Sequence, residues 1–127
     1  MTIEQGFLWF AEAVMATALA LFVQGFRVRR SDNALHQRLG KLGALLVIVG
    51  LVAVEVLMHG MHWSFPVRDR TLLHVHISVA SVALALLLAL VFTGMKGPRS
   101  VHVKLWVLFF PCYAATVVTS LLAFRLW

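Results

Sequence analysis

Apolar residues fill four long stretches of the chain, at residues 6–26, 39–59, 73–93 and 105–124. Each stretch holds about 20 residues, and a helix of that length, rising about 1.5 Å per residue, crosses a hydrocarbon layer of roughly 30 Å. Inside that layer backbone groups can bond only within the chain, so each stretch is predicted to be a helix. The pattern therefore predicts an all-α fold, an integral membrane four-helix up-and-down bundle, as a single transmembrane domain over residues 1–127.

The composition agrees with a membrane protein. Of the 127 residues, 61% are apolar and only 13% are charged, and the mean hydropathy is +0.92. Soluble domains are much less apolar than this. The chain holds one cysteine, which excludes an internal disulfide.

The net charge of +6 is concentrated in two connections between the apolar stretches. Residues 27–41 hold five basic side chains and one acidic one, and residues 96–104 hold three basic side chains and no acidic one. Because basic residues favour the cytoplasmic side, both loops are predicted to be cytoplasmic and both termini outside, in a bacterial-type inner (plasma) membrane. The charge is thus interpreted as a topology signal and not as a surface for nucleic acid.

The six histidines fall at the ends of the predicted helices. With this topology His36 and His102 share the cytoplasmic layer. The other four share the outer layer: His59, His62, His74 and His76. Paired imidazoles are common axial ligands of b-type haem, and a bundle interior is a common place for it. The two layers therefore predict one or two haem b groups, held between His36 and His102 and between His59 and His76.

Helical periodicity, at about 100° per residue, describes the faces around these histidines. Gly40, Gly43 and Gly50 share a face with His36, which suits the close approach of either a neighbouring helix or a flat macrocycle. The last helix carries one stripe: His102, Trp106, Phe109, Tyr113, Thr116 and Ser120. That stripe fits either inward packing or contact with a polar cofactor, with Tyr113 as a cofactor-binding residue. In the third helix small residues follow both His74 and His76, so periodicity does not choose between them.

Glu55 lies one helical turn inside His59, and Glu12 lies at a comparable depth. A carboxylate at this depth is costly unless it is paired or functional, so Glu55 is the candidate catalytic residue, as a proton relay for a redox cofactor or quinol. The same region suits an alternative, a non-haem copper or two-metal site. Its ligands would be drawn from these side chains: Glu55, Met58, His59, Met61, His62, His74 and His76. A third hypothesis is a structural oxidase-associated subunit with interfacial histidines.

Four short patterns carry a family resemblance: His36-Gln37-Arg38-Leu39, His59, Leu73 to His76 followed by Ser78 and Ala80, and His102 followed by Pro111, Thr119-Ser120 and Phe124. Over residues 30–127 the chain resembles the small four-helix, four-histidine membrane proteins whose best-known members are CtaM-like factors for haem–copper oxidases. Its layout is also distantly similar to that of b-type membrane cytochromes. It departs from the family pattern at Gly40, at Ser120 and in the extra His62 and His74. The resemblance implies metal or haem handling linked to aerobic respiration.

The sequence thus predicts a haem b-binding membrane protein that serves transmembrane electron transfer or the function or assembly of a respiratory oxidase. Such a protein is a redox carrier more than a classical enzyme, and the enzyme class is left open. The expected partners are membrane lipid and a haem–copper oxidase, a quinol or a cytochrome. Nucleic acid is not expected, and homo-oligomerisation is left open.

Overall fold

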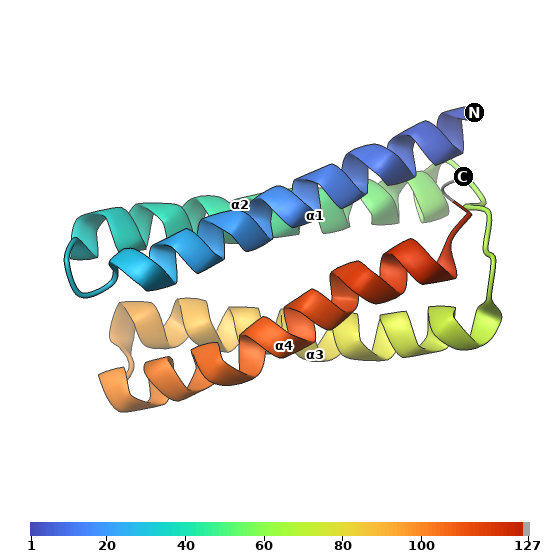
Figure 1. Cartoon of the computed structure of the whole chain (residues 1–127). Helices are drawn as coiled ribbons and strands as arrows, with labels where there is room; N and C mark the ends of the chain where they lie inside the picture. Colours follow the sequence, from blue (N-terminus) through green and yellow to red (C-terminus); the bar gives the residue numbers. More distant parts are fainter. Residues whose placement is uncertain (126–127) are drawn as a thin grey trace. The chain divides into compact units, whose positions relative to one another are not determined.

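The computed structural model describes residues 1–125 of the chain, and this part is almost entirely helical (Figure 1). Its long helices are α1 (Ile3–Val28), α2 (Asn33–Glu55), α3 (Arg70–Lys96) and α4 (Arg99–Ala123), and a short π turn, η1 (Val56–Gly60), extends α2. All four are long and apolar enough to cross a membrane. The predicted all-α fold of the membrane four-helix type is therefore confirmed.

Side chains next to the helix starts bind the backbone N–H groups that a first helical turn leaves without partners. Thr2 accepts from the Gln5 amide at 3.2 Å while Gln5 accepts from the Thr2 amide at 3.0 Å. Asp32 accepts from the Leu35 amide at 2.9 Å, and Asp69 caps α3 in the same way. The Asp32 cap starts α2 before His36, so that this histidine is already helical.

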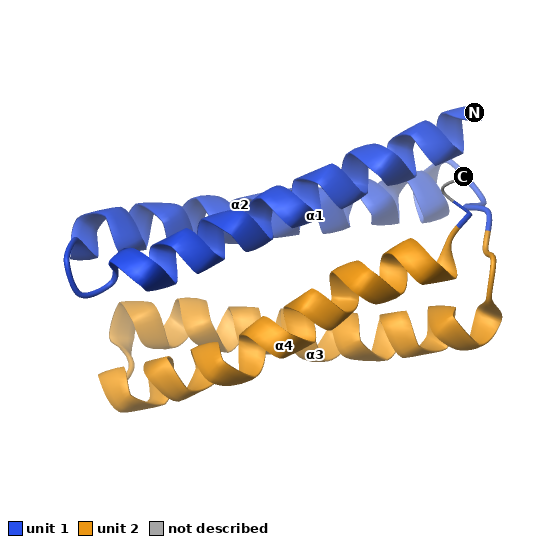
Figure 2. Ribbon diagram, viewed as in Figure 1, with its two compact units in different colours: residues 1–66, 125–127 blue, residues 67–124 orange. Residues whose placement is uncertain are grey.

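The chain divides into two compact units, each of them a helical hairpin (Figure 2). The first contains α1, α2 and η1, and its helices are joined by the short turn at residues 29–32. The second contains α3 and α4, joined at Gly97 and Pro98. In each hairpin the two helices run antiparallel side by side, as short connections require. Each hairpin thus has a turn end and an open end.

In the first hairpin an aromatic ring lies on the backbone of a glycine. A Cβ built on Gly43 would lie 2.6 Å from Cε1 of Phe22, whose side chain is only 1% exposed. Gly50 is an ordinary 3.8 Å from Val14, and Gly40 has no such neighbour within 4 Å. Of the two interpretations of this glycine face, close helix packing therefore applies at Gly43, where the missing side chain makes room for Phe22.

In the second hairpin the predicted stripe on α4 is the buried face of that helix. Its buried side chains include Trp106, Phe109, Tyr113 and Thr116, and those of α3 are Ala83, Leu87 and Leu90. Ring centroids lie 5.6 Å apart between Trp106 and Phe109 and 5.3 Å apart between Phe109 and Tyr113. The helix continues through Pro111, which is exposed. Periodicity alone therefore identified the packed face of α4.

Substituting Gly43 tests the packing of the first hairpin. Gly43→Ala forces a methyl group against the Phe22 ring, and overpacking of this kind costs about 1–3 kcal/mol. Gly40→Ala is the matched control, because its new methyl group meets nothing and alanine is up to about 1 kcal/mol better than glycine in a helix. Circular dichroism melting in detergent should show a lower Tm for Gly43→Ala and an unchanged or higher Tm for Gly40→Ala. Equal melting temperatures would contradict the packing described.

Candidate functional site

Four histidines occupy matching places in the two hairpins. His36 on α2 and His102 on α4 lie near the turn ends, whereas His59 on η1 and His76 on α3 lie near the open ends. A side-chain nitrogen of each of these four imidazoles has a hydrogen-bond partner. The partners differ from one histidine to the next, and those differences decide what each ring can do.

His36 bonds to the neighbouring helix. Its Nδ1 lies 2.9 Å from the carbonyl oxygen of Gly25 in α1. That carbonyl belongs to the last turn of α1, where the Arg29 amide bonds instead to Phe26. Since a carbonyl only accepts, Nδ1 of His36 carries the proton and donates it. The ring nitrogen that then carries the lone pair is Nε2.

His76 makes the equivalent contact in the second hairpin. Its Nδ1 lies 3.1 Å from the Thr116 carbonyl oxygen and 3.2 Å from Oγ1 of Thr119, both on α4. The Thr119 hydroxyl donates to the Ala115 carbonyl at 2.7 Å, so toward His76 it acts as an acceptor. His74 is exposed, and no hydrogen bond to its ring is present within residues 1–125. The structure thus makes the distinction between His74 and His76 that periodicity left open.

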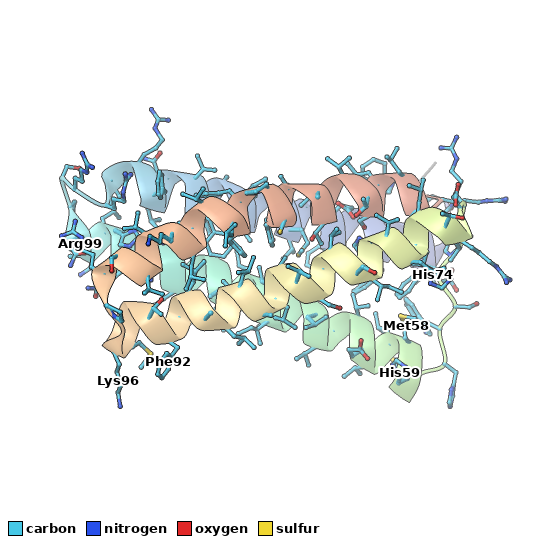
Figure 3. All side chains as sticks on the ribbon, turned by 90° about the horizontal axis from the view of Figure 1, so that it is seen from below. Met58, His59, His74, Phe92, Lys96 and Arg99 are labelled. Atoms are coloured by element: carbon cyan, nitrogen blue, oxygen red, sulfur yellow. The ribbon has the colours of Figure 1, made fainter. Side chains whose placement is uncertain are left out.

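His59 pairs with a carboxylate on its own helix. Its Nδ1 lies 2.9 Å from Oε2 of Glu55, and the two side chains are 74% and 59% exposed. His59 sits on the π turn η1, where the Met61 amide bonds to the Val56 carbonyl at 3.1 Å. Figure 3 shows Met58 and His59 on these last turns. π turns interrupt α-helices most often at functional sites. The turn ends at Gly60 with Met61 as its C-cap, and His62 follows in the left-handed region, with φ 55°.

His102 is held by both of its ring nitrogens. Trp106 Nε1 donates to Nε2 of His102 at 3.1 Å, and Nδ1 of His102 lies 3.0 Å from Oγ1 of Thr93 on α3. An indole N–H only donates, so the lone pair of His102 is on Nε2 and its proton is on Nδ1. The Thr93 hydroxyl donates to the Ala89 carbonyl at 2.8 Å and therefore accepts from His102. In this histidine the lone pair already has a partner.

Glu12 and Glu55, which the sequence placed at a comparable depth, differ in their surroundings. Glu12 is 8% exposed and belongs to the buried side of α1, whereas the Glu55 side chain is mostly exposed and bonds to His59. Tyr113, expected as a cofactor-binding residue, is 2% exposed within the core of the second hairpin. Its role toward a cofactor stays a prediction.

The predicted outer cluster draws on both hairpins. Glu55, His59 and His62 belong to the first, and His74 and His76 belong to the second. Within residues 1–125, no group of three or more His, Cys, Asp or Glu side chains is gathered as a metal site would need. The multi-ligand copper site also stays a prediction.

Sequence reasoning missed most of the partners of the histidines. Gly25, Thr93 and the carbonyl of Thr116 lie on the other helix of each hairpin, and no local pattern identifies them. One signal was present, because His102 and Trp106 are four residues apart and so neighbours on a helix surface.

No protein-family model, curated protein or solved structure matches the chain. The resemblance to the CtaM-like family therefore stays a prediction.

The arrangement around each imidazole can be measured directly. In protein labelled with ¹⁵N at histidine, at a pH where the rings are neutral, His36, His76 and His102 should be in the Nδ1–H form. His74 is the control, because an exposed imidazole without such an acceptor favours the Nε2–H form. ¹⁵N NMR distinguishes the two forms. An Nε2–H form at His76 would contradict the bond to Thr116.

Proposed function

We propose that this protein binds haem b through its hydrogen-bonded histidines and carries electrons across a membrane, in the service of a respiratory oxidase. The observation that carries the proposal is the state of the imidazoles. His36, His59 and His76 each use Nδ1 for a bond to an acceptor, which puts the lone pair that can coordinate a metal on Nε2. Histidines that ligate metals almost always have such a partner on the other nitrogen, because it fixes the tautomer and the ring orientation.

Membrane topology supports two layers of ligands. Residues 61–69 join the open ends of the hairpins, so if both hairpins cross the same membrane, His59 and His76 lie at one face and His36 and His102 at the other. The turn ends carry most of the basic residues, which favours the cytoplasm for that face, in a bacterial-type inner membrane. Two layers at opposite faces suit electron transfer from one side to the other.

The side chains also fit what haem requires. Neutral imidazole is a common axial ligand of b-type haem, which supplies one-electron transfer when it is bound. The basicity of the ligating imidazoles would differ, because Nδ1 of His59 bonds to a carboxylate whereas Nδ1 of His36 and of His76 bonds to a carbonyl. The pairs proposed from the sequence are His36 with His102 and His59 with His76.

Histidine variants test the proposal with a control beside each ligand. His76→Ala and His59→Ala should each lower the haem content by one site, that is by about half if both layers are filled, as measured by the pyridine haemochrome assay. His74→Ala and His62→Ala, which remove neighbouring histidines whose rings have no hydrogen bond within residues 1–125, should leave it unchanged. The double variant His59→Ala/His76→Ala should lose no more than either single variant, because the two ligands share one haem.

Other outcomes would point elsewhere. A colourless wild-type protein that carries copper, and loses it equally on substitution of His59, His62 or His74, would replace haem by the outer metal site. If the protein carries neither haem nor metal, the remaining hypothesis is a structural oxidase-associated subunit with interfacial histidines.

Glu55 is predicted to tune the bound haem without being needed for binding. In Glu55→Gln the amide oxygen still accepts the Nδ1 proton of His59, so the haem content should be retained. The midpoint potential should rise, because the carboxylate charge that favours the oxidised iron is lost. Glu4→Gln is the control for charge alone, because Glu4 lies at the same end of this hairpin and pairs with no histidine in the described part of the chain. Equal potentials in the two variants would contradict a specific role for Glu55.

A further inference from the structure

Three basic side chains lie around the turn between α3 and α4. They are Lys96, the last residue of α3, and Arg99 and Lys104 in the first turns of α4, and all three are exposed. Residues 70–127 contain no aspartate or glutamate, and Asp69 lies at the opposite end of α3. No hydrogen bond or ion pair involves these three side chains within residues 1–125. The turn thus gathers three positive charges without a counter-charge from its own hairpin.

Bonds among its own residues hold this turn in shape. The Gly97 amide donates to the Thr93 carbonyl at 3.0 Å, and the His102 amide donates to the Pro98 carbonyl at 3.1 Å. The His102 ring connects the two helices, because its Nδ1 lies 3.0 Å from Oγ1 of Thr93. A Cβ built on Gly97 would lie 2.6 Å from Cα of Thr93, so a larger residue at position 97 would have to shift the turn. The backbone positions that carry the three charges are therefore fixed.

Each basic side chain has an exposed apolar side chain four residues further from the connection, on the same side of its helix. These pairs are Lys96 with Phe92, Arg99 with Val103, and Lys104 with Leu108. The apolar members are 65%, 37% and 56% exposed, in that order. Figure 3 shows Phe92, Lys96 and Arg99 at this end of the hairpin. Since α3 and α4 are long enough to cross a membrane, the charged ends of these pairs fall at the headgroups and the apolar members fall in the hydrocarbon.

We propose that this turn binds an anionic phospholipid. The lipid phosphate lies among Lys96, Arg99 and Lys104, and the acyl chains lie along the apolar members of the three pairs. Basic clusters next to a membrane span attract anionic headgroups. A phospholipid has the same order of groups as each pair, with charge at the surface and hydrocarbon below it. Nucleic acid and acidic peptides match the charge but have no hydrocarbon to place along the helices. The proposal concerns the α3–α4 hairpin alone and does not depend on haem binding.

Membrane topology by itself does not require this arrangement. The topology signal depends on the number of basic residues near the ends of a span. It depends neither on a turn of fixed shape nor on an apolar side chain beside each charge. A lipid site depends on both, so variants that keep the charge and move the turn distinguish the two.

The experiment is an NMR titration of the ¹⁵N-labelled protein in an uncharged detergent. The probes are phosphatidylglycerol and phosphatidylcholine with the same acyl chains. Phosphatidylglycerol should shift the backbone amide resonances of residues 96–104 in a saturable way, and phosphatidylcholine should not. Salt at about 1 M should weaken the binding, because it reduces the screening length to about 3 Å.

Substitutions test the individual charges. Lys96→Gln, Arg99→Gln and Lys104→Gln should each weaken the binding of phosphatidylglycerol about fivefold, the factor expected for one basic side chain near anionic lipid. Arg70→Gln is the matched control, because it removes the same charge from an exposed residue at the opposite end of α3 and should leave the affinity unchanged. Gly97→Ala keeps every charge but shifts the turn, so it should weaken the binding as well.

Four outcomes would overturn the proposal. The first is equal shifts with the two lipids, or none with phosphatidylglycerol. The second is an equal loss of affinity in Arg70→Gln, because net charge would then be the cause. The third is wild-type affinity in Gly97→Ala, because the number of charges alone would then be sufficient. The fourth is an equal effect of glycerol phosphate on the same resonances, because the headgroup would then be recognised without its acyl chains.

Discussion

A polar group inside a membrane has no water to bond to, so it needs a partner within the chain. The backbone meets this requirement by forming helices along nearly the whole described length. Hydroxyls in these helices meet it by donating to the carbonyl four residues earlier, as Thr17, Ser78 and Ser81 do. The imidazoles of His36 and His76 meet it by donating to a carbonyl of the adjacent helix. The same requirement thus produces the helices, the hydroxyl bonds and the orientation of these two histidines.

The functional consequence comes from the two nitrogens of the imidazole ring. When Nδ1 donates to a fixed acceptor, the ring is held in place and Nε2 keeps the lone pair that coordinates metals. The acceptor is a carbonyl for His36 and His76 and a carboxylate for His59. For His102 both nitrogens are occupied, because Trp106 lies one turn along the same helix. Histidines that look alike in the sequence therefore differ in the structure in the hydrogen-bond partners of their ring nitrogens.

The sequence predicted those features that depend on local pattern. Hydropathy located the helices, and periodicity identified the buried face of α4. It did not predict that Phe22 would pack on Gly43 or that His36 would reach Gly25, because these contacts join different helices. It could not choose His76 over His74, since small residues follow both. The π turn at His59 also escaped prediction, because its composition does not differ from that of an ordinary helix end.

The central claim is that the hydrogen-bonded histidines hold haem b. It is tested most directly by a reduced-minus-oxidised absorption spectrum of the detergent-purified wild-type protein, with iron and copper quantified on the same sample. The account predicts the sharp α band of a low-spin b-type haem, with one or two irons per chain and no stoichiometric copper. A protein without this band that carries copper or zinc, or no metal at all, would contradict it.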